Sequence, residues 1–192
     1  ERYLTPDELA RLGKVLRESN SEREAVNCIH LLLLTGCRLS EIQTLKWDYV
    51  DFDAGVLRLP DSKTGAKLVA IGQAVIDLFK TIPKVKDNPY VITGQVEGQH
   101  LTDMQKPWRR LRKRAGLDGL RIHDLRHSFA SDALQLGEDL PMIGKLLGHT
   151  QVQTTARYAH LKTDPIRAAA DKVSDAIATA LTRPTKEEGV AA

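Results

Sequence analysis

The chain lacks the features that mark several special classes of protein. It holds only two cysteines, Cys28 and Cys37, and they form neither a CxxC pair nor an evenly spaced framework. This pattern favours neither a disulfide scaffold nor a zinc ribbon. Two plain thiols fit a reducing cytoplasm, where we expect both to be small buried residues.

Long hydrophobic runs are missing as well. The longest apolar block, around residues 31–34, is far shorter than the roughly 18 residues that a membrane-spanning helix needs. The first residues, Glu1-Arg2-Tyr3, include neither Met nor the apolar core of a signal peptide. We therefore expect a cytoplasmic protein without a membrane partner, and a chain that is either a fragment of a longer protein or trimmed at its start.

The composition is that of an ordinary globular domain, with 192 residues, 42% hydrophobic and 28% charged. The net charge of +3 says little about partners. One segment nevertheless holds six positive charges and no negative one: Lys106, Arg109, Arg110, Arg112, Lys113 and Arg114. A solvated helix face and a surface that binds DNA phosphates both fit this run.

Helical patterns dominate the chain. Thr5-Pro6-Asp7-Glu8 is a capping box with proline at the first helical position. Ser21-Glu22-Arg23-Glu24 has the form of a second capping box, for a helix that Gly36 ends. Further helices are predicted over 40–47, 74–81, 102–115, 123–136, 140–147, 154–160 and 164–181.

A small β region interrupts the helices. Residues 56–59 and 67–71 are strand-like, and Asp61-Ser62-Lys63-Thr64-Gly65 between them has turn chemistry, so we expect a hairpin. Residues 51–53 can add a short third strand. The sequence thus predicts a mainly α protein with a small antiparallel sheet, of class α+β. We expect one domain over 1–181 and a disordered tail over 182–192.

The predicted helix over 123–136 carries a His-x-x-Arg pattern. Leu125, Phe129, Ala133 and Leu136 fall on one stripe, which should face the core, with His123 and His127 on the other side. His123 and Arg126 are neighbours at i, i+3 and can both border a pocket. Taken alone, the pattern is better explained by a solvated pair, or by a buried pair whose polar groups find partners in the core, than by a functional site.

Four segments together carry a resemblance to a known family. They are Gly36-Cys37-Arg38-Leu39-Ser40-Glu41-Ile42, His123-Asp124-Leu125-Arg126, Leu146-Leu147-Gly148-His149 and Thr154-Thr155-Ala156-Arg157-Tyr158. In order and spacing they resemble the catalytic domain of the tyrosine recombinases, or phage integrases, over about residues 4–161. That family has the order Arg, hairpin Lys, His-x-x-Arg, His or Trp, Tyr. The resemblance implies this catalytic-domain fold.

By this resemblance Tyr158 matches the nucleophile, while Arg38 and Arg126 match the two arginines that hold the scissile phosphate. Planar guanidinium groups suit this task because they contact phosphate oxygens through two hydrogen bonds. The attack adds charge to those oxygens, so fixed positive donors stabilise the transition state. A covalent link to Tyr158 conserves the phosphodiester energy, and religation needs no ATP.

The other matched positions serve proton transfer and support. Lys63 in the predicted hairpin turn matches the lysine that acts as general acid, although Lys67 is a nearby rival for this role. His123 matches the first histidine of the family, and His149 the position filled by His or Trp. Glu41 matches an acidic position that braces the first arginine. Each residue alone has an ordinary structural interpretation, and only the ordered set points to catalysis.

The resemblance also implies partners. We expect double-stranded DNA as a partner and a homotetramer on paired sites that passes through a Holliday junction. Without DNA, a monomer stays open as an alternative. The family has an N-terminal core-binding domain that we do not find in this chain. The bacterial style of the Leu-Gly-His segment favours a recombinase, which we expect to be bacterial or phage-encoded. Phage integration, transfer of a mobile element and chromosome resolution all stay open as its role.

Two other functions stay open, namely a type IB topoisomerase-like enzyme and a catalytically silent helical DNA-binding module. A third interpretation is a metal site formed by the histidines at 123, 127, 149 and 160. No carboxylate or cysteine completes a convincing site with them. We therefore expect no metal and no cofactor.

Overall fold

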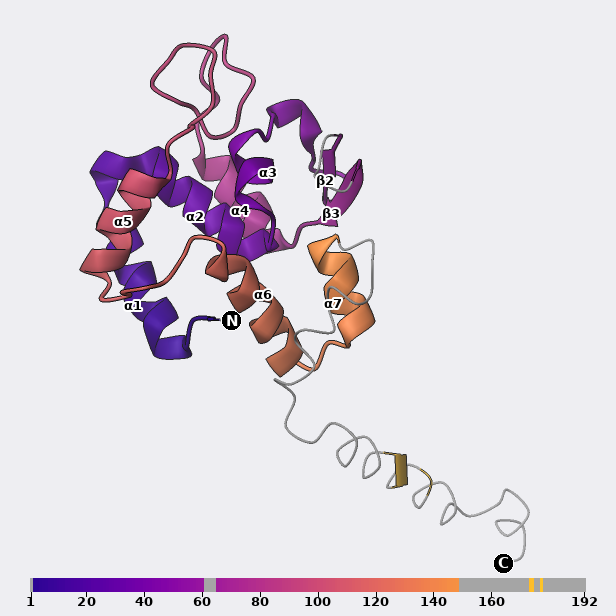
Figure 1. The fold of residues 1–192 in the computed structure, drawn as a ribbon. Helices are drawn as coiled ribbons and strands as arrows, with labels where there is room; N and C mark the ends of the chain where they lie inside the picture. The colour runs from indigo at the N-terminus through magenta and orange to yellow at the C-terminus, as the bar shows by residue number, and fades with distance from the viewer. Residues whose placement is uncertain (1, 61–64, 149–172, 175–176, 178–192) are drawn as a thin grey trace, which may run out of the picture. The chain divides into compact units, whose positions relative to one another are not determined.

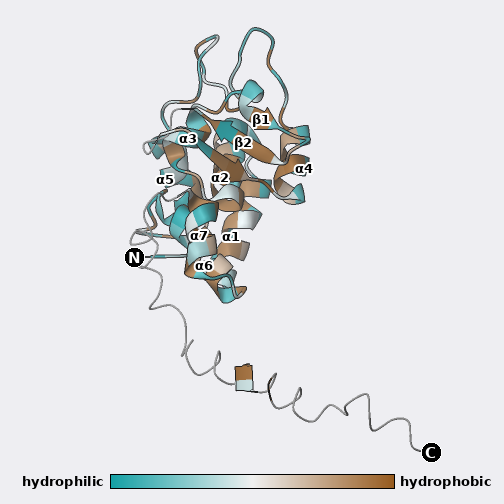
Figure 2. Ribbon diagram, turned by 90° about the vertical axis from the view of Figure 1, so that its right-hand side faces the viewer, coloured by the Kyte–Doolittle hydropathy of each residue, from teal (hydrophilic) through white to brown (hydrophobic). Residues whose placement is uncertain are grey.

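Helix α2 (Arg23–Thr35) is the helix around which the other described elements are arranged in the computed structural model (Figure 1). It is hydrophobic along most of its length (Figure 2), with Ile29 and Leu31 fully buried. It ends at Gly36, which has the left-handed conformation (φ 62°) that a helix C-cap favours. Three helices pack against α2: α3 (Leu39–Gln43), α4 (Gln73–Thr81) and α6 (Asp124–Gln135).

The structure describes residues 2–60, 65–148, 173–174 and 177. The chain divides into two units, Glu1–Ala159 and His160–Ala192. In the second unit the described residues Val173, Ser174 and Ile177 are helical, and both apolar side chains are more than half exposed. The rest of the predicted helix over 164–181, the helix over 154–160 and the tail lie outside the described residues.

Helices α1 (Pro6–Arg17) and α5 (Gln105–Arg114) pack against each other. The first capping box is confirmed, because Thr5 Oγ1 accepts a hydrogen bond from Glu8 N while Glu8 accepts one from Thr5 N. The apolar residues of the basic run point inward, with Trp108 and Leu111 fully buried. The apolar side of helix α5 therefore packs against the core, and its positively charged residues lie on the other side.

The predicted hairpin is confirmed. Strands β2 (Val56–Leu59) and β3 (Lys67–Ala70) are antiparallel, and Leu59 pairs with Lys67 at the end next to the turn. The third strand, β1 (Val50–Asp51), lies beside β2 and slightly before the predicted position. It ends early because the Asp51 carboxylate accepts a hydrogen bond from Ala54 N and closes a turn. Turn residues 61–64 lie outside the described residues.

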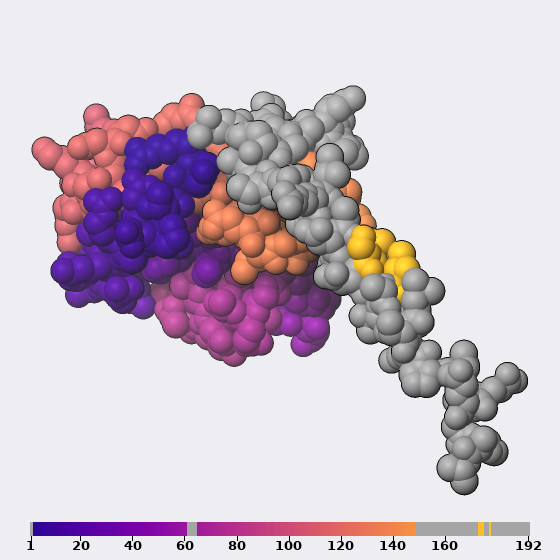
Figure 3. All heavy atoms as spheres, turned by 90° about the horizontal axis from the view of Figure 1, so that it is seen from below, coloured from indigo at the N-terminus to yellow at the C-terminus, as the bar shows by residue number. Residues whose placement is uncertain are grey.

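Helix α7 (Leu140–Leu147) matches its predicted bounds. Asp139 caps its first turn by accepting a hydrogen bond from Met142 N, and Gly148 ends it in the left-handed conformation (φ 65°). α7 packs against α6 and against β3. Seen from below, its orange atoms share one face of the molecule with the indigo atoms of α1 (Figure 3).

The second predicted capping box is wrong. A short 3₁₀ helix, η1 (Asn20–Glu22), precedes α2, and α2 has no side-chain cap. Glu24, the expected capping partner, instead accepts a hydrogen bond from Thr93 N at 3.2 Å. The helix predicted over 40–47 is also shorter, since α3 ends at Gln43 and a second 3₁₀ helix, η2 (Trp47–Tyr49), follows.

The buried stripe predicted for α6 is confirmed only in part. Leu125 and Ala133 are buried and Phe129 is half-buried, but Leu136 is 84% exposed, and the polar residues Arg126, His127 and Ser128 are buried as well. The reason is that α6 packs between α2 and α7 while Ser128 Oγ accepts a hydrogen bond from Leu4 N at 2.9 Å. A helix enclosed on several sides must bury polar residues, which find partners within the protein.

Two expectations from the composition concern cysteines and membranes. Cys28 and Cys37 are both free and buried, as predicted, and burial raises the pKa of the Cys28 thiol to about 12. Within the part of the chain that the structure describes, no helix combines the length and the apolar character needed to cross a membrane.

Candidate active site

Arg38 stands at the start of α3, where Glu41 holds it by two hydrogen bonds. Glu41 accepts from Arg38 N at 2.8 Å and from Arg38 Nη1 at 2.9 Å. The Glu41 side chain is only 3% exposed, whereas that of Arg38 is 20% exposed. Bonding to a buried carboxylate fixes the orientation of the guanidinium while leaving part of it open to solvent.

Glu41 has a second cationic partner in β3. Lys67 Nζ lies 2.8 Å from Glu41 Oε2, and the lysine side chain is only 9% exposed. Burial alone would raise the pKa of Glu41, but the hydrogen bonds from Lys67 and Arg38 outweigh it and hold this pKa below its ordinary value. The carboxylate is therefore ionised at neutral pH and shared between two cations.

Arg126 joins two further segments. It is 4% exposed, and its guanidinium donates to Gly36 O through Nη1 and to Leu147 O through Nη2, the latter at 2.8 Å. Gly36 lies just before Arg38 in the chain, and Leu147 lies just before His149. One buried side chain thus brings the Arg38 segment and the end of α7 to the beginning of α6.

His123 is the residue that precedes α6, and its side chain is exposed. Partial burial, the charge of Arg126 and, more weakly, that of Arg38 lower its pKa below the ordinary value of 6.5. Its ring lies edge to face against that of His127, with 5.0 Å between centroids. At neutral pH His123 is therefore uncharged, the form that can accept a proton.

One support of this site escaped the sequence reasoning. Asp124, only 1% exposed, accepts hydrogen bonds from Arg121 N at 2.8 Å and Arg121 Nη2 at 2.7 Å. The pair closes the turn that leads into α6 and so sets the position of His123. The aspartate in the first turn of the predicted helix was a signal for such a cap.

The structure therefore brings together Arg38, Glu41, His123 and Arg126. The other predicted catalytic residues, Lys63, His149 and Tyr158, lie outside the described residues. Among the residues that are described, no group of three His, Cys, Asp or Glu side chains is arranged to hold a metal ion.

The basic run on α5 is partly engaged within the domain. Arg110 pairs with Glu22, Arg112 donates to Leu120 O at 2.7 Å, and Arg114 donates to Ser19 Oγ at 2.7 Å. The other three positions, Lys106, Arg109 and Lys113, are exposed. Of these, Lys106 lies 3.8 Å from Asp103. DNA binding by this run stays a prediction, with these three exposed side chains as its best candidates.

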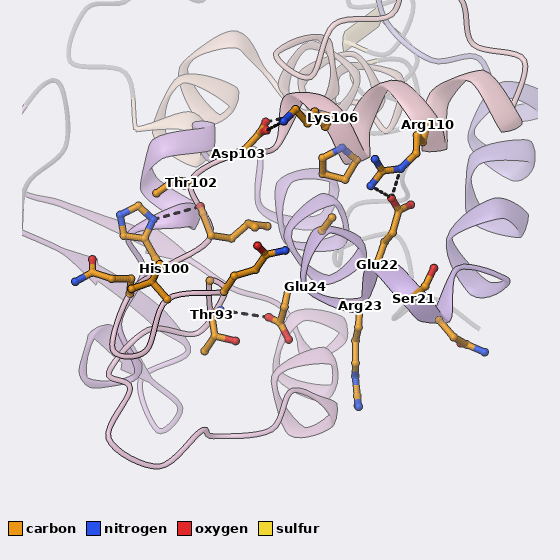
Figure 4. A pocket seen from close by; sticks show the side chains of 18 residues that line it. Ser21, Glu22, Arg23, Glu24, Thr93, His100, Thr102, Asp103, Lys106 and Arg110 are labelled. Atoms are coloured by element: carbon orange, nitrogen blue, oxygen red, sulfur yellow. Dashed lines mark hydrogen bonds and ion pairs between the residues drawn. The ribbon is translucent and has the colours of Figure 1, made fainter.

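A pocket of about 710 Å³ lies beside the start of α5 (Figure 4). Its charged groups are largely paired, as shown by Lys106 with Asp103 and Arg110 with Glu22. The pocket adjoins the first turn of α2, whereas Arg38 follows the last turn of that helix. The pocket is therefore separate from the cluster formed by Arg38, Glu41, His123 and Arg126.

Residues 2–164 match the model of the phage integrase family. The chain belongs to this family. Its members are the tyrosine recombinases, a family of DNA breaking and rejoining enzymes, and the match covers most of this chain.

Individual relatives agree with the family match. The shufflon-specific DNA recombinase of Escherichia coli is 29% identical over 164 residues, which cover 84% of this chain and 41% of the relative. The chain spans about half the length of the curated relatives it matches.

Solved structures show the fold directly. The catalytic domain of bacteriophage HP1 integrase matches with a TM-score of 0.66 and 25% identity, covering 88% of this chain and 93% of that domain. The XerH site-specific recombinase bound to its difH substrate matches with a TM-score of 0.70 and 25% identity, covering 88% of this chain and 52% of XerH. The predicted fold of a tyrosine recombinase catalytic domain is confirmed.

Proposed function

We propose that this chain is the catalytic domain of a site-specific recombinase that integrates or excises DNA through a 3′-phosphotyrosine at Tyr158. The observation that carries the proposal is the position of Arg126. Its two carbonyl contacts join the Arg38 segment to the end of α7, directly before His149. Segments that are distant in the sequence thereby lie next to one another, which supports the proposal.

In this proposal Arg38 and Arg126 hold the non-bridging oxygens of the scissile phosphate. Arg38 is oriented by Glu41 before DNA arrives. The planar guanidinium group of Arg126 has the fork of N–H donors that suits phosphate oxygens. Fixed donors aimed at developing charge each raise the rate by about a hundredfold or more.

Proton transfer accompanies the attack. The phenol of Tyr158 has an ordinary pKa of about 10, so it needs a cationic pocket and a base at neutral pH. Uncharged His123 is suited to accept the phenolic proton, and His149 adds a donor to the phosphate. Lys63 protonates the departing 5′ oxygen. The reaction needs no metal or cofactor, because the arginines and histidines supply the charge.

The proposed partner is double-stranded DNA, a proposal supported by the likeness to XerH, which is bound to its difH substrate. We further propose a cytoplasmic enzyme, encoded by a bacterium or a phage, which acts as a tetramer on paired sites through a Holliday junction. Exchange between two sites requires several active subunits, whereas the chain without DNA can be a monomer. The catalytic domain is proposed to span 1–181, before a disordered tail.

Assembly can be tested by removing the residues after Asp164. Retained folding with lost assembly on DNA would support docking of this segment on a neighbouring subunit. Lost folding would show instead that the segment packs on its own domain. Circular dichroism and sedimentation in the presence of DNA distinguish the two results.

The covalent step is tested by incubating the chain with a pool of nicked duplexes of random sequence. Nicks let the cleaved strand diffuse away, so a covalent adduct accumulates and survives denaturing electrophoresis. Tyr158→Phe should abolish the adduct, and the matched control Tyr3→Phe should retain it. If the pool yields no adduct with the unaltered chain, the chain is better described as a silent DNA-binding module.

The topoisomerase alternative has its own signature. A type IB enzyme nicks and relaxes supercoiled plasmid without pairing two sites. Relaxation of plasmids of any sequence, with no recombinant product from two selected sites, would favour that alternative over recombination.

A further inference from the structure

Lys67 lies where three parts of the proposed site meet. It pairs with Leu59 at the last register position before the hairpin turn, and Lys63 lies midway in sequence between these two residues. Its ammonium group contacts Glu41, which holds Arg38. Its methylene stem packs so closely on Gly148 that a Cβ at this glycine would lie 2.8 Å from Lys67 Cδ.

We propose that Lys67 is a positioning residue that holds Glu41, and through it Arg38, in place and packs against Gly148, the residue before His149. The inference rests on the proposed function and deepens it. In that role Lys67 acts through Glu41 and through packing, and it does not touch the reacting phosphate. The role of general acid stays with Lys63.

The surroundings of Lys67 argue against its being the acid. The side chain is only 9% exposed, and its ammonium donates to a carboxylate at 2.8 Å. To reach a leaving oxygen it would have to abandon Glu41, whose side chain is 3% exposed. A buried carboxylate that loses a cationic partner is costly, so this movement is unfavourable.

The Glu41 carboxylate explains how a change at Lys67 reaches Arg38. One oxygen, Oε2, accepts from both Lys67 Nζ and Arg38 N, while Oε1 accepts from Arg38 Nη1. Loss of the lysine leaves the carboxylate with Arg38 alone, and the pair is free to shift. Hydrogen bonds to charged groups contribute about 1.5–3 kcal/mol, which corresponds to roughly tenfold to hundredfold in rate.

The test uses a leaving group that needs no proton. In normal DNA the Tyr158 oxygen forms a bond to phosphorus, the bond from phosphorus to the 5′ oxygen breaks, and Lys63 protonates that oxygen. With sulfur in the 5′ bridging position the bond to sulfur breaks instead, and the group departs as a thiolate, because thiols are far more acidic than alcohols. Loss of the general acid is therefore rescued by sulfur, whereas misplacement of Arg38 is not.

We expect Lys67→Met, which keeps the stem, to slow adduct formation by about tenfold or more on both substrates. Lys63→Met should be slow on normal DNA and restored on the sulfur substrate. Lys67→Arg, which can still donate to Glu41, should recover most of the rate. Rescue of Lys67→Met by sulfur, or an unchanged rate on both substrates, would overturn the proposal.

A double variant distinguishes the loss of the contact between Lys67 and Glu41 from a general loss of folding. Glu41→Gln removes the carboxylate, so adding Lys67→Met to it creates no unpaired charge. If Lys67 acts through Glu41, the double variant should react about as fast as Glu41→Gln alone. A further large loss in a folded double variant overturns the proposal. An unaltered chain that forms no adduct overturns the proposed function and this inference with it, whereas the variant results bear on Lys67 alone.

Discussion

Arg126 donates a hydrogen bond to the main-chain oxygen of Leu147 at 2.8 Å, across the space between α6 and α7. Arg126 also donates to Gly36 O, at the end of α2. The last carbonyl groups of a helix have no partner within that helix and carry partial negative charge. A buried guanidinium therefore satisfies the ends of two helices at once.

Arg126→Ala should destabilise the domain, because the substitution leaves both buried carbonyl groups without this donor. We expect the free energy of unfolding to fall by about 3 kcal/mol or more, as measured by urea denaturation. Arg126→Lys keeps the charge, but its single ammonium cannot span both carbonyls, and it should recover only part of the loss.

The control for this pair is Arg109→Ala, which removes an exposed arginine of α5 and should change stability by less than about 0.5 kcal/mol. An Arg126→Ala domain as stable as this control would contradict the structural role.

Gly36→Ala should be more harmful than Gly137→Ala, although both glycines have positive φ. A Cβ at Gly36 would lie 2.5 Å from Phe129 Cδ1 and 2.9 Å from Leu147 Cδ2, whereas nothing lies within 4 Å at Gly137. We expect losses of about 3 and about 1 kcal/mol respectively. Equal losses in thermal or urea unfolding would mean that the close packing at Gly36 has no energetic weight.

The pH dependence of adduct formation should reveal His123. Because its pKa is lowered from 6.5, the ring is uncharged at pH 7 and becomes protonated only below its ordinary range. We expect the rate to be flat near neutrality and to fall as the pH drops below 6.5, since the protonated ring cannot accept the Tyr158 proton. His123→Asn should be slow throughout and lack this fall. A midpoint at or above pH 6.5 in the unaltered chain would argue against the assignment.

The salt dependence of DNA binding should distinguish the basic residues of α5 that contact phosphate from those that are bonded within the domain. We expect weak binding that falls steeply with salt, because phosphate contacts dominate it. Arg109→Gln or Lys113→Gln should reduce the slope of log affinity against log salt by about 1. Arg114→Gln, which removes the bond to Ser19, should lower stability and leave the slope unchanged. A gel shift with nanomolar, salt-insensitive binding would contradict this expectation.

The local elements were predictable from the sequence where a single residue type decides them. Thr5 begins α1 and Gly148 ends α7 as predicted, since caps depend on adjacent residues. Ser21 does not cap α2, and its expected partner Glu24 instead accepts a hydrogen bond from Thr93 N in a distant loop. Leu136 failed as a core residue because the neighbours of α6, and not its own periodicity, decide which sides are buried.

The site was predictable to a different degree. The resemblance identified Arg38 and Glu41, and the structure places them in direct contact. The carbonyl contacts of Arg126 had no signal in the sequence, because main-chain oxygens are the same at every position. The sequence indicates Lys67 only as a rival acid, since its nearness to Glu41 depends on how the fold places β3 relative to α3.

The two arginines of the cluster are held in different ways, and this has an evolutionary consequence. Arg38 is partly exposed at the start of a short helix, and Glu41 would still have Lys67 as a partner without it, so a descendant that abandoned DNA cleavage could replace it at a smaller cost in stability than Arg126. Arg126 closes two helix ends in the interior, so the same descendant would have to keep it in order to fold. Among diverged copies of this domain, the residue at position 38 would therefore report on activity, whereas an arginine at position 126 would report only on the architecture.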